Sequence, residues 1–318
     1  MENTIMIATA GEGAALPDGL VEKYFQGRAT LSSDILDGTA MERDFQEGYS
    51  RGAFSVLVAL EKSAPLGFCA VREERGVRQV AHVYLDEAAR EGDAGRDLLL
   101  KVKDDFLGAG DLMCLTGIII PYLCGIDGHD LISWGYQAYE RCTMERDLME
   151  VPEERDLPSG MEIVPLKEGY FWRCAEALYR AGKDSIDNVI RPGVFATPWA
   201  CFSFLNHIKR NMFGAFDCAM SFVAREKEKV AGAIFGTLRP HGDGFMPALF
   251  VDPRYQGKGV GSALTVALLR KFKEMGLPRI SLCVTASNMN AIGLYRRLGF
   301  EVTARFFEIQ LMKAREPQ

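Results

Sequence analysis

The hydrophobic pattern of residues 161–311 alternates apolar runs of strand length with longer segments of helical period. Short apolar runs bounded by turn residues are typical of buried strands, whereas apolar positions spaced by three and four indicate helices. We expect strands at 161–166, 218–225, 229–239, 244–251, 279–285 and 301–311. We expect helices at 171–182, at 198–210, from 262 onwards, and between Asn288 and Gly299. This order of elements predicts a mixed α/β domain.

Residues 1–150 contain a degenerate copy of the same pattern. Strands are expected at 4–8, 54–61, 65–73, 78–86, 111–120 and 136–148, and helices at 18–25, 39–49, 94–109 and 129–133. The apolar run 54–60 lies about 164 positions before 218–224, and Gly135 lies 164 positions before Gly299. Such a constant offset indicates a tandem duplication. The sequence therefore predicts two domains, 1–150 and 161–318, joined by a linker at 151–160 that contains two prolines and a charge run.

The composition favours a soluble cytoplasmic protein. The chain has 318 residues, 48% of them hydrophobic, which is ample for two cores. Its start lacks the basic region of a secretory signal, and its longest apolar stretch, 112–126, is too short and too interrupted to span a bilayer. Eight cysteines without a C-x-x-C pair indicate buried thiols in a reducing compartment. Four scattered histidines give no reason to expect a metal site.

The two halves of the chain differ in charge. Residues 1–157 have a net charge of −14 and residues 158–318 of +8. A basic domain suits a ligand that carries phosphates, and an acidic one could attract a cationic amine, although ordinary solvated surfaces account for the same charges. Basic patches interleaved with aromatic residues are absent, so we expect no nucleic-acid partner.

The segment 251–261, VDPRYQGKGVG, is the strongest candidate for a binding loop. It lies between an expected strand and an expected helix, and its glycines stand at alternate positions. A helix start presents unpaired N–H groups and the positive end of the helix dipole, and glycine lets an anion approach the backbone closely. The spacing fits neither the P-loop nor the dinucleotide fingerprint. The loop therefore predicts a phosphate site of another kind.

A second motif follows about thirty residues later. With the spacing Gln256-x-x-Gly259-x-Gly261, the order Asn288, Ala291, Leu294, Tyr295, Gly299, Phe300 resembles the GCN5-related N-acetyltransferase (GNAT) superfamily over residues 160–311. Either Asn288 or Asn290 fits the asparagine of that motif. The resemblance implies an α/β fold of two tandem GNAT-type domains, each with a mixed, mostly antiparallel central sheet flanked by helices. It also implies splayed central strands that admit a pantetheine arm.

The resemblance implies acetyl-CoA as cosubstrate, with no metal. The residues expected to bind it are Leu249, Phe250, Val251, Gln256, Gly257, Lys258, Gly259, Val260, Gly261, Ser262, Asn288 and Arg297. Arg297 could reach a phosphate, or it could simply complement the dipole at its helix end. Tyr295 is the expected acid for the departing thiolate, and a core tyrosine is the alternative. In the first domain, Ala94 and Arg96 replace Gly259 and Gly261, so we expect no second site.

The general base and the acceptor are less defined. The strand 245–251 carries no carboxylate, so Asp252 is only a weak candidate, beside Asp243, Glu226 or a tyrosine. The expected function is transfer of an acetyl group to a primary amine of a small molecule by direct attack in a ternary complex. A non-catalytic acyl-CoA-binding module and a protein or peptide N-acetyltransferase are the alternatives. We expect residues 183–199 and the first domain to set the acceptor, in a monomer or a homodimer.

Overall fold

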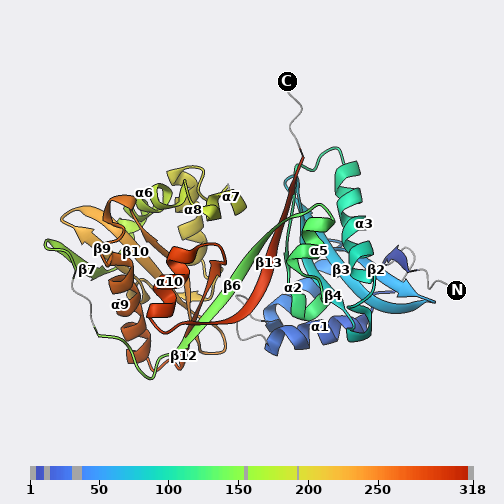
Figure 1. Cartoon of the computed structure of the whole chain (residues 1–318), viewed down its shortest axis with the longest axis horizontal. Coiled ribbons are helices and arrows are strands. Elements are labelled where there is room, and N and C mark those ends of the chain that lie inside the picture. Colours follow the sequence, from blue (N-terminus) through green and yellow to red (C-terminus); the bar gives the residue numbers. More distant parts are fainter. Residues whose placement is uncertain (1–4, 11–14, 31–37, 154–156, 192, 314–318) are drawn as a thin grey trace. The chain divides into compact units, whose positions relative to one another are not determined.

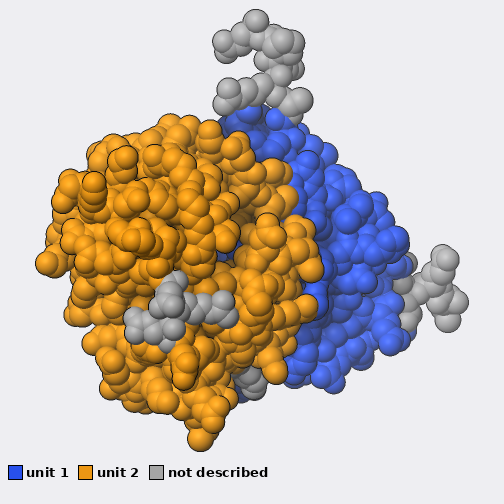
Figure 2. All heavy atoms as spheres, turned by 60° about the vertical axis from the view of Figure 1, so that its left-hand side comes forward, with its two compact units in different colours: residues 1–34, 38–141, 305–318 blue, residues 35–37, 142–304 orange. Residues whose placement is uncertain are grey.

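The computed structural model describes residues 5–10, 15–30, 38–153, 157–191 and 193–313 (Figure 1). Among these, the contacts divide the chain into two compact units (Figure 2). Unit 1 holds the described residues up to Arg141 together with 305–313, and unit 2 holds 142–304. The two units are described separately below.

Unit 1 is built on a mostly antiparallel sheet in the order β1-β2-β3-β4-β5-β13. Its strands are β1 (Met6–Thr9), β2 (Ser55–Glu61), β3 (Ala64–Glu74), β4 (Val77–Leu85), β5 (Cys114–Ile119) and the end of β13 (Glu301–Met312). Among the strands that the structure describes in this unit, only β4 and β5 run parallel, from Val77↔Cys114 to Val80↔Gly117. The helices are α1 (Asp18–Thr30), α2 (Gly38–Ser50), η1 (Glu87–Ala89), α3 (Ala94–Gly108), α4 (Pro121–Cys124) and α5 (Gly128–Ser133).

Side chains alternate across the sheet of unit 1, as a pleated strand requires. Along β3, Phe68 and Ala70 join a core with α1 and α2, whereas Cys69 and Val71 join a second core with α3. The helices therefore cover both faces of the sheet. All eight cysteines of the chain are free thiols.

Unit 2 repeats this plan in the order β7-β9-β10-β11-β12, with the end of β6 (Gln137–Asp147) beside β12. Its strands are β7 (Met161–Pro165), β8 (Ala215–Phe216), β9 (Phe222–Glu226), β10 (Lys229–Leu238), β11 (Gly244–Val251) and β12 (Arg279–Thr285). The helices are η2 (Glu168–Tyr170), α6 (Phe171–Gly182), α7 (Ile186–Ile190), α8 (Pro198–Lys209), η3 (Cys218–Met220), η4 (Pro253–Tyr255), α9 (Val260–Glu274) and α10 (Met289–Arg297).

Two cores also sandwich the sheet of unit 2. On β10, Ile234 packs with α9 through Leu264 and Leu268, whereas Phe235 packs with α6 and α8 through Phe171 and Leu205. Helices therefore flank this sheet on both sides, as the sequence predicted. Within the described residues, each helix is too short or too polar to cross a bilayer.

Two long strands are shared between the units. β6 (Gln137–Asp147) begins in unit 1 and ends in unit 2, and β13 begins in unit 2 and ends in unit 1. The end of β13 pairs with β5, from Phe307↔Ile119 to Met312↔Cys114. The compact units are thus not contiguous in sequence, whereas the predicted domains 1–150 and 161–318 are. Part of the predicted linker 151–160 lies outside the described residues.

The internal repeat is visible in local geometry. In both units three antiparallel strands lead to one short parallel pairing, β4 with β5 and β11 with β12. The amide of Tyr136 donates to Leu131 O at 3.0 Å, and the amide of Phe300 donates to Tyr295 O at the same distance. Each bond closes a helix through a glycine with positive φ, Gly135 or Gly299. These equivalent caps lie 164 residues apart.

A few predicted elements differ from the structure. The strand expected at 218–225 begins only at Phe222, because Asp217 caps a turn of 3₁₀ helix over Cys218–Met220 by accepting from the Ala219 amide at 2.8 Å. The short helices α4 and α7 were not expected, since one or two turns carry too little periodic signal. Thr4, expected to open the first strand, lies outside the described residues.

Candidate acetyl-CoA site

The central strands β11 and β12 separate along their length. Their parallel pairing runs only from Gly244↔Ile280 to Met246↔Leu282. The next residue, Pro247, has no N–H to donate, which suits a position where a ladder ends. On its other side β11 stays paired with β10 up to Gly232↔Val251. The gap expected from the sequence therefore opens beside residues 247–251.

The register decides which main-chain groups face this gap. The amide of Asp252 donates to Ala231 O at 2.8 Å. Because hydrogen-bonded pairs alternate along an antiparallel ladder, Phe250 also bonds toward β10. Leu249 and Val251 therefore direct their main-chain groups away from β10, toward the gap. Of the three predicted residues, these two are available to an extended ligand through the backbone, whereas Phe250 is not.

The loop that follows β11 offers a row of unpaired amides. None of the amides from Gly257 to Ser262 donates a backbone hydrogen bond within the described part of the chain; such bonds resume with Ala263 N to Gly259 O at 3.0 Å. Gly259 is the N-cap of the 15-residue helix α9 and makes no side-chain cap. Gly257 and Gly259 have φ of 73° and 83°, and a Cβ added to either would meet no atom within 4 Å. This arrangement suits an anion at a helix start.

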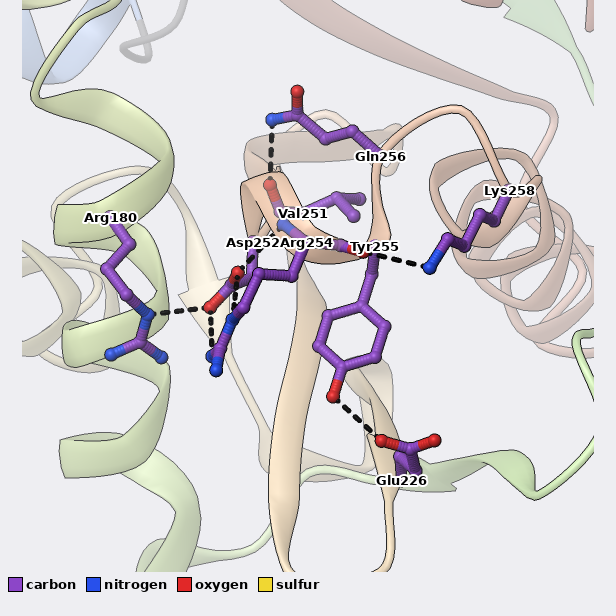
Figure 3. A network of polar contacts seen from close by, with 8 residues as sticks. All are labelled: Arg180, Glu226, Val251, Asp252, Arg254, Tyr255, Gln256 and Lys258. Carbon is purple, nitrogen blue, oxygen red and sulfur yellow. Dashed lines mark hydrogen bonds and ion pairs between the residues drawn. The ribbon is translucent and has the colours of Figure 1, made fainter.

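The polar side chains of the loop bind the loop itself (Figure 3). Gln256 Nε2 donates to Val251 O at 3.0 Å, which ties the loop to the end of β11. Lys258 Nζ donates to Arg254 O at 3.0 Å and lies 5.6 Å from the centre of the Tyr255 ring. Among the residues described, the backbone amides of the loop are therefore left unpaired, whereas these two side chains are already engaged.

Asp252 is the most constrained carboxylate near the loop. It is fully buried, and it accepts from Arg180 Nε at 2.6 Å and from Arg254 Nε at 2.9 Å (Figure 3). The hydrogen bond from the Arg254 side chain, followed by that from Arg180, holds the pKa of Asp252 well below its ordinary value despite the opposing effect of burial. These contacts argue against the role of general base, because so weak a base takes up a proton poorly.

The other carboxylates considered from the sequence are also engaged. Buried Asp243 accepts from Arg279 Nε at 2.7 Å and lies 3.3 Å from His241 Nε2. Glu226 accepts from the Tyr255 hydroxyl at 2.9 Å. Both therefore stabilise local structure.

Helix α10 places the second motif. Asn288 is its N-cap and accepts from the Ala291 amide at 3.2 Å, whereas Asn290 lies within the helix and is exposed. Tyr295 is 7% exposed and makes an edge contact with Phe300 at a centroid distance of 5.8 Å. Burial, and then the nearby charge of Asp187, raise the pKa of Tyr295, so its hydroxyl stays protonated. Arg297 is exposed in the last turn.

Gly261 lies where the two predicted motifs meet. A Cβ at this position would lie 3.5 Å from both Leu294 Cδ2 and Val251 Cγ2. The loop, the end of β11 and helix α10 therefore meet where the strands diverge. The two motifs, residues 251–261 and 288–300, thus lie next to each other in unit 2.

The equivalent loop of unit 1 has a different character. Helix α3 starts at Ala94, and its N-cap Asp93 has ordinary right-handed geometry. Arg96 pairs with Asp93 at 2.9 Å and with Asp97 at 3.3 Å. Carboxylates at this helix start repel a phosphate and already neutralise the nearby cation.

Two side chains at the site were not singled out from the sequence. Arg180, in the last turn of α6, reaches Asp252. Asp187, in α7, accepts from Thr285 Oγ1 at 2.7 Å. We expected residues 183–199 to set the acceptor, and Asp187 was included only as a member of that segment. Its partner Thr285 lies 98 residues away, and no local sequence pattern marks such a pair.

Comparison with known proteins places this site in a family. Residues 194–300 match the acetyltransferase (GNAT) family model. A solved GCN5-related N-acetyltransferase from Sphaerobacter thermophilus matches with a TM-score of 0.67 and 18% identity, over 96% of this chain and 95% of that one. Residues 194–300 therefore carry a GNAT-family domain, and the chain has the fold of GNAT proteins, as the sequence predicted. This family uses acetyl-CoA.

Its relatives include mycothiol acetyltransferases. That of Rhodococcus erythropolis is 29% identical over 312 residues, which cover 94% of this chain and 95% of the relative. That of Saccharomonospora viridis is 46% identical, but over 63 residues that span only 20% of each protein. Several of the mycothiol acetyltransferases matched are aligned over a third of their length or less.

Proposed function

We propose that the chain is an acyltransferase that moves an acetyl group from acetyl-CoA to a primary amine of a small molecule, in a single ternary complex. The main support is the row of unpaired amides from Gly257 to Ser262 at the start of α9, beside an opening between β11 and β12. Its similarity to the mycothiol acetyltransferase of Rhodococcus erythropolis over nearly the whole chain supports a small acceptor.

The cosubstrate would be held mainly by the backbone. The amides of Gly257, Lys258, Gly259, Val260, Gly261 and Ser262 would receive the pyrophosphate. The main-chain groups of Leu249 and the amide of Val251 would bind the pantetheine arm, since Val251 O already accepts from Gln256. One of those amides would also polarise the thioester carbonyl, the oxyanion role in acyl transfer. Gln256 would fix the loop entrance, Asn288 would fix the start of α10, and Arg297 would be available to an outer phosphate.

Tyr295 would act as the general acid. Acetyl-CoA supplies an activated acyl group whose carbon forms a bond to the amine nitrogen while its bond to sulfur breaks. The departing thiolate needs a proton, and a buried tyrosine that stays protonated can donate one. The location of Tyr295 on α10, one residue from the Leu294 side chain that approaches Gly261, supports this role.

The proposal is tested by acetyl-CoA binding and by thiol release. Calorimetry should detect binding to the wild type, and a screen of amines, aminoglycosides, polyamines and peptides should identify acceptors by the release of CoA thiol. Binding without thiol release for every acceptor, and no difference between the wild type and Tyr295→Phe, would instead support a non-catalytic acyl-CoA-binding module. Turnover confined to peptides would support a peptide N-acetyltransferase.

A further inference from the structure

Asp187 and Thr285 form a polar pair at the opening of the central strands. Thr285 ends β12, beyond Leu282, where pairing with β11 stops. Its hydroxyl is buried and donates to Asp187 Oδ1 at 2.7 Å, although 98 residues separate the two in sequence. The bond brings helix α7 to the stretch of β12 that lies beyond its pairing with β11. It also fixes the orientation of the carboxylate.

The same carboxylate lies within electrostatic range of the proposed acid. After burial, Asp187 is the group whose charge raises the pKa of the Tyr295 hydroxyl. Tyr295 follows Thr285 by ten residues, through the turn capped by Asn288. Three polar groups therefore lie near one another: the Thr285 hydroxyl at the end of β12, the Asp187 carboxylate on α7 and the Tyr295 phenol on α10.

The reaction needs a group of this kind. As the C–N bond forms, the amine nitrogen becomes cationic and acidic, and its proton must pass to a base. Asp252 is held by two arginines, Asp243 by Arg279, and Glu226 by Tyr255. The strand β11, from Gly244 to Val251, contains no carboxylate.

We propose that Asp187 binds the acceptor amine and takes its proton, and that Thr285 is a positioning residue that holds the carboxylate for this step. The inference rests on the proposed function and names the amine-binding group of that site. The nitrogen loses its proton to the Asp187 carboxylate while the thiolate gains one from Tyr295. Solvent then removes the first proton and restores the second, so the proton balance closes. The acceptor is a primary amine that presents its N–H groups to a carboxylate.

The test compares Asp187→Asn with Glu228→Gln, a control carboxylate of unit 2 that lies outside residues 183–199. The Glu228 side chain is 79% exposed and pairs with Arg173 at 3.0 Å, an exposed ion pair that contributes little to stability. Acetyl-CoA affinity is measured by calorimetry on the full chain. Thiol release is measured with benzylamine, D-glucosamine and spermidine at saturating acetyl-CoA. Thr285→Val and Thr285→Ser complete the series.

We expect Asp187→Asn to lower kcat/KM for the accepted amine about a hundredfold, with acetyl-CoA affinity unchanged. Thr285→Val should lower kcat/KM about tenfold by loosening the carboxylate, and Thr285→Ser should restore most of it. Glu228→Gln should match the wild type. Wild-type kcat/KM in Asp187→Asn, or an equal loss in Glu228→Gln, would overturn the inference, and so would weakened acetyl-CoA binding in Asp187→Asn.

The two proposals fail in different ways. A wild type that binds no acetyl-CoA would overturn the proposed function and this inference with it. A wild type that binds acetyl-CoA but releases no thiol with any of the three amines would overturn the assignment of an amine-binding carboxylate. Thiol release that is insensitive to Asp187→Asn would leave the proposed function standing and exclude Asp187 as the amine-binding group.

Discussion

Arg180 Nε and Asp252 Oδ2 lie 2.6 Å apart, which joins the end of helix α6 to the end of strand β11 (Figure 3). The carboxylate is buried, and Arg254 binds it from the loop side. This pairing fixes the point at which the chain leaves the sheet and enters the glycine loop. We therefore expect this ion pair to support the proposed cosubstrate site.

Replacing Asp252 with asparagine should lower the free energy of unfolding by about 2 kcal/mol, because the change weakens the charged hydrogen bonds that a buried carboxylate accepts from the partly exposed side chains of Arg180 and Arg254. Since the folded-state pKa of Asp252 is depressed, its stabilisation is present above about pH 4 and is lost as the pH falls through the folded-state pKa. Urea unfolding at pH 7 and at pH 3 should therefore show a smaller difference between wild type and variant in acid. A difference that does not change with pH would contradict this account.

Tyr295→Phe should reduce kcat by about a hundredfold or more, because it removes the proton for the leaving thiolate. The ring contact with Phe300 is kept, so acetyl-CoA affinity and stability should change little. Tyr170→Phe, which removes a hydroxyl bonded to Arg225 elsewhere in unit 2, is the matched control and should retain full activity. Similar rates for both variants would exclude Tyr295 as the acid.

Gly259→Asp should abolish acetyl-CoA binding. The added Cβ meets no protein atom, but the carboxylate would stand at the amide row and repel phosphates. The positive φ of 83° costs about 1–2 kcal/mol for any residue with a side chain. Gly276→Asp, at a φ of 76° after α9, reproduces that strain away from the loop and should bind normally. Undiminished affinity in Gly259→Asp would remove the loop from the site.

Calorimetric titration should give one acetyl-CoA per chain. The second loop, around Ala94, presents the ion pairs of Arg96 with Asp93 and Asp97 where unit 2 presents unpaired amides. Asp93→Lys should leave this stoichiometry unchanged, because one charge does not recreate the glycine geometry. Two molecules bound per wild-type chain would show that unit 1 retains a site.

His82 should make unit 1 sensitive to acid. Burial, and then the charges of Arg28 and Arg72, lower the pKa of His82 to about 3. A neutral histidine in the fold contributes stability above its unfolded-state pKa, and that stability is lost as the pH falls below about 6.5, by up to about 1.4 kcal/mol per pH unit. His82→Gln should be less stable than wild type at pH 7, with a smaller gap at pH 5. Urea unfolding at the two values is the measurement, and a constant gap would contradict the prediction.

Much of the fold could be predicted because its signals are local. The helices Phe171–Gly182 and Pro198–Lys209 follow from apolar spacing, and the latter also from its Thr197 cap. The turns at Gly135 and Gly299 follow from the glycines that positive φ favours. The 3₁₀ turn at Cys218 was missed because its hydrophobic residues resemble a strand. The hydrogen bond that stabilises the turn is donated by the Ala219 amide to the Asp217 side chain.

The amino-acid sequence was enough to predict the internal repeat, the glycine loop after β11 and the resemblance to the GNAT family, because each depends on residues close together along the chain. Tertiary structure alone decided that β6 and β13 are shared by the two units, and that Asp252 is held by arginines. It also decided that Asp187 meets Thr285. A strand edge or a carboxylate takes whichever partner the packed chain brings to it, and short-range pattern does not encode that choice.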